Sequence, residues 1–206
     1  MGSEPDGVVD LWTRWEGWLA RYAPDLRSGL RPPAPREAVA AVEERLGVVL
    51  PRDFRDSLAV HDGAEEVSGL VGGWDLMRLD HVVQEAETMR RLSSQGAFGD
   101  ASGEPHRAIS TGWWHPNWVP VVSSGSGHFF CIDLAPTAAG TVGQIILVLH
   151  DDGRRFLVAN SYSRWLAAVV SDLEEGAYRL EDDEWNHLAF MRSSREGRDL
   201  YPGTSS

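Results

Sequence analysis

Seven side chains that could hold a metal ion or move a proton gather in the second half of the chain. They are His106, His115, His128, Asp133, His150, Asp151 and Asp152. Histidine and aspartate ligate zinc and manganese, so a metal-dependent enzyme using His128, Asp133 and His150 is one hypothesis. No two histidines have the H-x-H or i, i+4 spacing that places ligands together by local geometry. The pattern therefore favours the absence of a metal site.

Two further features could carry chemistry, and both have a plainer interpretation. Cys131 stands between Phe130 and Ile132 without a basic neighbour to lower its pKa, which favours a buried, inert thiol. The Gly-Ser-Gly sequence at 125–127 lacks the lysine and the strand–loop–helix context of a phosphate-binding loop. A hairpin turn explains it better.

Asp133 is the hardest of these residues to interpret. In an alternating strand it shares a face with Phe129 and Cys131. If that face is the inner one, the carboxylate needs hydrogen-bond partners to be buried there. Capping the turn at Ala135 and Pro136 is favoured over contact with a ligand.

These residues lie in the most β-prone part of the chain, which predicts three strands over 118–122, 128–134 and 142–149. The connections are short and rich in Ser, Gly, Ala and Pro. Parallel strands need longer crossovers, so the three strands should form an antiparallel meander. Asp151-Asp152-Gly153 predicts another hairpin, with a returning strand over 155–159.

Helical periodicity predicts the elements that flank this sheet. An amphipathic helix over 8–22 carries three tryptophans on its buried side, and further helices are expected from Pro35 to Leu46, from Pro51, over 81–92 and after Ser161 or Ser163. Gly47 should end the second helix and Asp80 should be the N-cap of the fourth. Residues 69–77 suggest a short strand, and 93–110 a long, polar surface loop.

Composition limits the kind of partner. The chain has 206 residues, with 31 acidic against 19 basic, for a net charge of −12. This balance disfavours nucleic acid, because phosphate binders need clustered Lys and Arg, and could instead attract a basic partner. Solubility explains the excess of acid equally well.

A single cysteine excludes an intramolecular disulfide and suits a reducing compartment. No stretch reads as a signal peptide or a bilayer span. We therefore expect a cytoplasmic protein that does not enter a membrane.

The order of these signals resembles the SUKH superfamily, specifically the type related to the yeast cell-wall-assembly regulators. The resemblance covers roughly residues 30–178. Its marks are the helix ending at Gly47, Leu50-Pro51, Asp62-Gly63 where the family usually has Asn-Gly, the Trp-x-Pro strand at 118–120, Gly127, Asp133, Pro136, Gly143-Gln144 and Trp165-Leu166.

The resemblance implies an α+β single domain with a curved, mostly antiparallel sheet flanked by helices and no catalytic residues. It also implies a protein-binding role, since bacterial members resemble toxin-immunity proteins and fungal members resemble interaction hubs. We accordingly expect an amphipathic helical extension at 1–29, the SUKH-like domain at 30–178 and, at 179–206, an acidic extension with a short helix over 184–192 and a loose tail from residue 193. No cofactor is expected.

Three hypotheses of function remain open. The first is a non-enzymatic immunity-type protein that binds and neutralises a toxin, with a basic toxin domain as its partner. The second is a cytosolic regulatory or scaffold protein, and the third is the metal-dependent enzyme. Tryptophans and carboxylates are common at interfaces, although core packing and a solvated acidic face compete with this interpretation. The candidate contact residues are Trp74, Trp113, Trp114, Asp133, Asp182, Asp183 and Glu184.

Overall fold

The computed structural model describes residues 7–65, 69–99, 101, 103–181 and 187–190. Its main sheet has six strands in the order β1-β3-β4-β5-β6-β2, antiparallel except where β2 runs parallel to β6. A second sheet pairs β7 with β8. The strands are β1 (Asp75–Leu76), β2 (Glu104–Pro105), β3 (Trp118–Ser123), β4 (Phe129–Asp133), β5 (Gln144–Val148), β6 (Arg154–Ala159), β7 (Tyr178–Glu181) and β8 (His187–Phe190). The predicted α+β class and the meander are confirmed.

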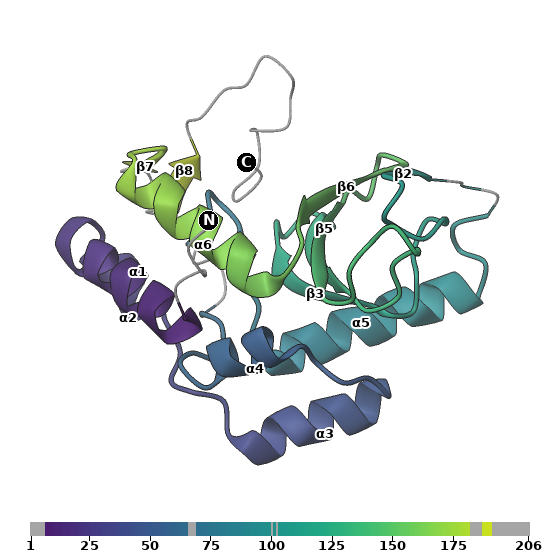
Figure 1. Cartoon of the computed structure of the whole chain (residues 1–206), viewed down its shortest axis with the longest axis horizontal. Coiled ribbons are helices and arrows are strands. Elements are labelled where there is room, and N and C mark those ends of the chain that lie inside the picture. Colours follow the sequence, from purple (N-terminus) through teal and green to yellow (C-terminus); the bar gives the residue numbers. More distant parts are fainter. Residues whose placement is uncertain (1–6, 66–68, 100, 102, 182–186, 191–206) are drawn as a thin grey trace.

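The helices are α1 (Val8–Tyr22), α2 (Pro24–Ser28), α3 (Arg36–Leu46), α4 (Arg52–Leu58), α5 (Leu79–Ser94) and α6 (Tyr162–Glu174). Helix α5 packs on β3, and α6 packs on β5 and β6 (Figure 1). Helix α3 lies outside α5, while α1 contacts α4 and α6. Among the described helices, none has the length and apolar character needed to cross a membrane.

Strands β4 and β5 are buried along their whole length, which explains their nearly continuous apolar sequences. Phe130 packs on Trp165 of α6, with ring centroids 6.0 Å apart. On the opposite face of β4, Phe129 meets Trp114 edge to face at 6.3 Å. The side chains on both faces of β4 therefore pack into the hydrophobic core, and neither face is turned to solvent.

Helix α1 packs on the rest of the domain through the tryptophans of its buried face. Trp12 and Trp15 stack with centroids 4.9 Å apart, and both are fully buried. The Trp12 indole N–H donates to Ser57 Oγ at 2.8 Å, and Ser57 Oγ lies 3.1 Å from the Tyr162 hydroxyl. This chain of polar contacts joins α1 to α4 and α6, so α1 belongs to the common core.

Four local expectations differ from the structure. Helix α5 begins at Leu79 with Arg78 as N-cap, not with Asp80, because the Asp62 carboxylate accepts the Leu79 N–H at 2.8 Å. The strand expected over 69–77 shortens to β1. The loop expected over 93–110 contains β2, and its Ala108 and Ile109 are buried. The short helix expected over 184–192 is wrong for residues 187–190, which form β8 and pair with β7. The proposed boundaries at residues 29 and 178 stay predictions.

Candidate binding groove

A groove of about 500 Å³ opens between the second half of α5 and the end of the sheet where β4 begins and β5 ends. Its lining is mainly apolar, with Glu85 and His150 as the groups able to carry charge. The lining residues are Glu85, Thr88, Met89, Leu92, Ala97, Phe98, Ala101, Trp113, Gly127, Phe129, Val148, Leu149 and His150. An apolar wall with a few polar groups is typical of a binding surface.

Among the predicted contact residues that the structure describes, Trp113 alone lines this groove, and a buried arginine fixes its position. The Arg155 guanidinium lies over the Trp113 ring at 4.9 Å and donates through Nη2 to the Trp113 carbonyl at 2.7 Å. Arg155 also donates through Nη1 to the carbonyls of Asp152 and Arg154. Burial lowers the pKa of Arg155, and Asp152 opposes this shift. The arginine thus orders both the tryptophan and the turn before β6.

Aromatic and flexible side chains surround Trp113 within the groove. The Phe98 ring lies 6.5 Å from the Trp113 ring, measured between centroids. Met89 and Leu92 of α5 are partly exposed and lie one helical turn apart. Tryptophan and methionine are enriched at protein interfaces, and methionine adapts readily to different partners. These side chains could accept an apolar side chain of another protein.

Of the three residues in the metal hypothesis, the structure brings His128 and His150 together but not Asp133. His128 and His150 lie side by side at the edge of the groove, with ring centroids 4.8 Å apart. Asp133 lies at the opposite end of β4, so the three residues do not form one site. Asp151 joins the two histidines instead.

Asp133 is fully buried and hydrogen-bonded. Its Oδ1 accepts the Ala135 N–H at 2.9 Å, which is the expected cap on the turn. Its Oδ2 accepts from Gln144 Nε2 at 2.9 Å, and the same Nε2 donates to the Ala108 carbonyl at 3.0 Å. Burial raises the pKa of Asp133, while these hydrogen bonds oppose the shift. The carboxylate therefore holds the connection between β4 and β5 and, through Gln144, the segment at Ala108. Both lie at the end of the sheet opposite the groove, here called the closed end.

Two other predicted contact residues, Trp74 and Trp114, lie in the core with 8% and 5% of their surface exposed. Trp74 packs on Phe130 at 4.9 Å, and Trp114 packs on Trp118 at 5.7 Å. We therefore leave both out of the surface proposed below. Asp182, Asp183 and Glu184 lie outside the described residues.

Cys131 is buried, and burial raises the pKa of its thiol well above the usual value.

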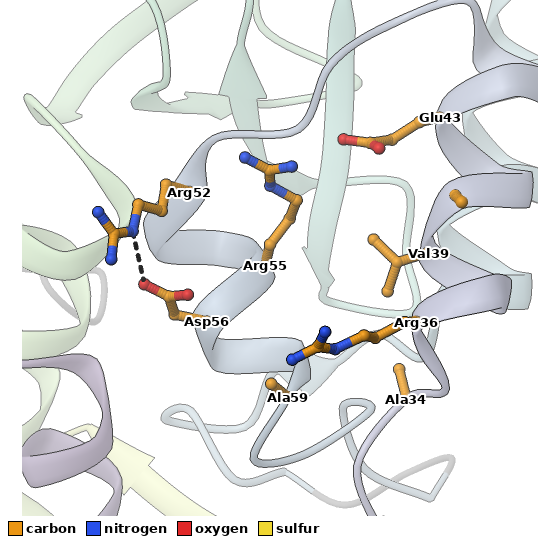
Figure 2. Close-up of a pocket in the computed structure, with 9 residues that line it drawn as sticks. Ala34, Arg36, Val39, Glu43, Arg52, Arg55, Asp56 and Ala59 are labelled. Carbon is orange, nitrogen blue, oxygen red and sulfur yellow. Dashed lines mark ion pairs between the residues drawn. The ribbon is translucent and has the colours of Figure 1, made fainter.

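A second cleft of about 460 Å³ separates α3 from α4 and has a different character. Figure 2 shows Arg36 reaching from α3 toward α4, with Arg55 and the ion pair of Arg52 and Asp56 on the facing helix. Arg52 Nε lies 3.6 Å from Asp56 Oδ2. Trp74, Trp113, Trp114 and Asp133, the predicted contact residues within the described part of the chain, do not line this cleft. Its polar, exposed lining offers less apolar contact than the groove.

Three residues that line the groove, and the arginine that holds Trp113, were not predicted as functional candidates. Met89 and Leu92 lie within the helix expected over 81–92, Phe98 in the expected surface loop and Arg155 in an expected strand. One signal was available for Arg155. An arginine inside an apolar strand needs a buried partner, and carbonyl groups of a nearby turn can provide it.

Helices on both faces of a mostly antiparallel sheet define an α+β domain. The model of the SMI1/KNR4 family (SUKH-1) matches residues 33–168. The chain therefore belongs to the SMI1/KNR4 family, and the resemblance inferred from the sequence is confirmed.

Curated relatives from fungi extend this comparison. The cell wall biosynthesis/cell cycle regulator smi1 of Schizosaccharomyces pombe is 30% identical, across 88% of this chain and 39% of the relative. The cell wall assembly regulator SMI1 of Saccharomyces cerevisiae is 28% identical, across 89% and 44%. The glucan synthesis regulatory protein of Neurospora crassa is 27% identical, across 88% and 41%. The chain thus spans about two fifths of the length of these relatives.

Proposed function

We propose that this chain is a non-enzymatic regulatory module that binds a protein partner through the groove around Trp113. The observation that carries the proposal is the ordered Trp113, held by the buried Arg155 in an otherwise apolar groove. Rigid aromatic side chains contribute large contact areas at little entropic cost, which is why tryptophans recur among binding hot spots. The relatives named above are regulators, which supports the regulatory interpretation.

The groove defines the chemistry of the partner segment. Its apolar wall suits an apolar anchor side chain, while Glu85 within the groove and Asp151 beside His150 suit a neighbouring lysine or arginine. The net charge of −12 would speed the approach of a basic segment. We therefore expect a partner segment in which an apolar residue is flanked by basic residues.

The immunity hypothesis is less well supported than the regulatory one. The comparisons name regulators of cell-wall assembly, and toxin binding rests only on the acidic charge and on the resemblance to bacterial members. A cytoplasmic location fits the regulatory proposal, because a lone, buried cysteine needs no oxidising compartment. Both the compartment and the partner belong to the proposal.

Quantitative capture of partners from a lysate of the source organism tests this function. The bait proteins are the wild type, Trp113→Ala, Met89→Gln and the control Val142→Gln. Val142 is 67% exposed and lies before β5, at the opposite end of the sheet from the groove. We expect the two groove variants to lose a partner roughly 30-fold, as hot-spot truncations of about 2 kcal/mol do.

The control should retain that partner, and a rise in salt should weaken its capture. Circular dichroism of each bait verifies that the fold is intact. Equal recovery of every specific partner by all four baits would contradict the placement of the contact surface. Recovery of one basic, toxin-like protein that binds the wild type but not the groove variants would favour the immunity hypothesis over the regulatory one.

A further inference from the structure

The two histidines beside the groove are neighbours only because of the sheet register. His128 precedes β4 and His150 follows β5, and the pairing of Phe129 with Val148 brings the two ends together. Their Nδ1 atoms are 3.4 Å apart. Asp151 Oδ1 lies 3.8 Å from His128 Nδ1, and the ligand atoms of all three residues lie within 4.8 Å of one another.

This spacing matches the coordination shell of a small metal ion. Zinc binds imidazole nitrogen and carboxylate oxygen at about 2.0–2.2 Å, so neighbouring ligand atoms of a tetrahedral site are about 3.3–3.5 Å apart. The separation of the two Nδ1 atoms meets this value. Asp151 must approach His128 by a few tenths of an ångström and must also come within ligand spacing of His150, which its side chain, 65% exposed, can do by rotating.

The local hydrogen bonding indicates that His128 offers a lone pair. The His150 backbone N–H donates to His128 Nδ1 at 3.1 Å, so this nitrogen is unprotonated, as ligation requires. His150 Nδ1 faces the same atom, and two imidazole nitrogens this close need a proton or a cation between them. A metal ion bound to His128 Nδ1 would displace the hydrogen bond from the His150 backbone N–H. His150 is exposed, so water can then accept a hydrogen bond from this N–H.

Both rings are held in place before any metal arrives. A side chain at Gly127 would meet the His150 Cβ at 3.2 Å, so the glycine lets the turn pack directly on this histidine. The His128 ring lies 6.3 Å from the Trp74 ring, between centroids. Ordered ligands lower the entropic cost of binding.

We propose that His128, His150 and Asp151 form a binding site for one Zn²⁺ ion, with water as the fourth ligand. Two imidazoles and one carboxylate suit zinc and related transition metals better than Mg²⁺ or Ca²⁺, which prefer oxygen ligands. The bound ion would link the turn before β4 to the turn after β5 at the edge of the groove. This inference does not depend on the proposed function, since zinc binding needs no protein partner.

Titration of the metal-free full chain with Zn²⁺, followed by calorimetry, tests the site. We expect one equivalent to bind, with affinity reduced at least tenfold in His150→Gln and in Asp151→Asn. The control His106→Gln removes an exposed histidine elsewhere and should bind as the wild type does. Magnesium at the same concentration should give no binding heat.

Cobalt substitution gives an independent readout, because tetrahedral Co²⁺ absorbs intensely in the visible region. We expect this absorption in the wild type and the control, and its loss in His150→Gln. Both substituted residues are exposed, so folding should persist, and the thermal midpoint without metal verifies this. Binding of zinc that is absent, substoichiometric or equally strong in every variant would overturn the proposal.

Discussion

The two ends of strands β4 and β5 are built from similar polar residue types but in opposite ways. At one end Asp133 and Gln144 are fully buried, and each hydrogen-bonds to its surroundings. At the other end His128, His150 and Asp151 remain partly or fully exposed beside the groove. The difference indicates that buried, satisfied polar groups hold the fold together, whereas the groove end retains side chains available for binding.

The largest effect expected from this comparison concerns the closed end. Asp133→Ala should lower the free energy of unfolding by roughly 3 kcal/mol, because it leaves the Ala135 N–H and an amide hydrogen of Gln144 without their buried acceptor. Asp151→Ala lies at the end of the sheet beside the groove, here called the open end. This substitution should change the free energy of unfolding by less than about 0.5 kcal/mol. Urea denaturation measures both values. Equal losses at the two ends would break the comparison.

A smaller effect on the free energy of unfolding is expected for Arg155, which holds Trp113 in the groove. Arg155→Leu should cost roughly 2 kcal/mol, because three carbonyl groups lose their donor and Trp113 loses its stacking partner. The neighbouring Arg154→Leu should cost less than about 1 kcal/mol, since Arg154 makes a surface ion pair. Thermal unfolding of the two variants checks this contrast. A larger cost for Arg154→Leu would contradict the supporting role of Arg155.

The smallest effect concerns pH at the open end. The side-chain hydrogen bonds from Arg154 and its backbone N–H lower the pKa of Asp152 from 3.8 to about 2. A lowered pKa in the folded state stabilises the protein above pH 4, and this contribution disappears as the pH falls toward 2. The pair is on the surface, so the effect should stay below about 1 kcal/mol.

Asp152→Asn measures this contribution directly. The variant should be slightly less stable than the wild type at pH 6, and the difference in free energy of unfolding should shrink at pH 3. A difference that is unchanged or larger at pH 3 would assign the effect to another group.

Much of the fold followed from local patterns. The period of α1 predicted its bounds and the buried side that carries Trp12 and Trp15, but not which part of the molecule this side packs on. The apolar runs of β3, β4 and β5, divided by short turns, predicted the meander to within about two residues. Of the two serines proposed as the N-cap of α6, Ser161 is the one that caps it. In each case the information lies within one element.

The remaining features depend on residues that are distant in the sequence. Asp62 caps α5 from 17 residues away, so the local candidate Asp80 was the wrong choice. His128 and His150 meet through strand register, which spacing along one element does not encode. Trp113 and Trp114 are adjacent and equally apolar, yet one lines the groove and the other enters the core. Arg155, which donates to the Trp113 carbonyl and lies over the Trp113 ring, holds this tryptophan at the groove.

Site-specific photo-crosslinking in cells of the source organism tests the central claim, that the open end of the sheet is the contact surface. A crosslinking amino acid replaces Leu92 in the groove or the exposed Ala139 near the closed end. We predict a discrete crosslinked protein from position 92 that is absent from position 139 and is lost when Trp113→Ala is added. Crosslinks that form at position 139 and not at position 92 would contradict the account.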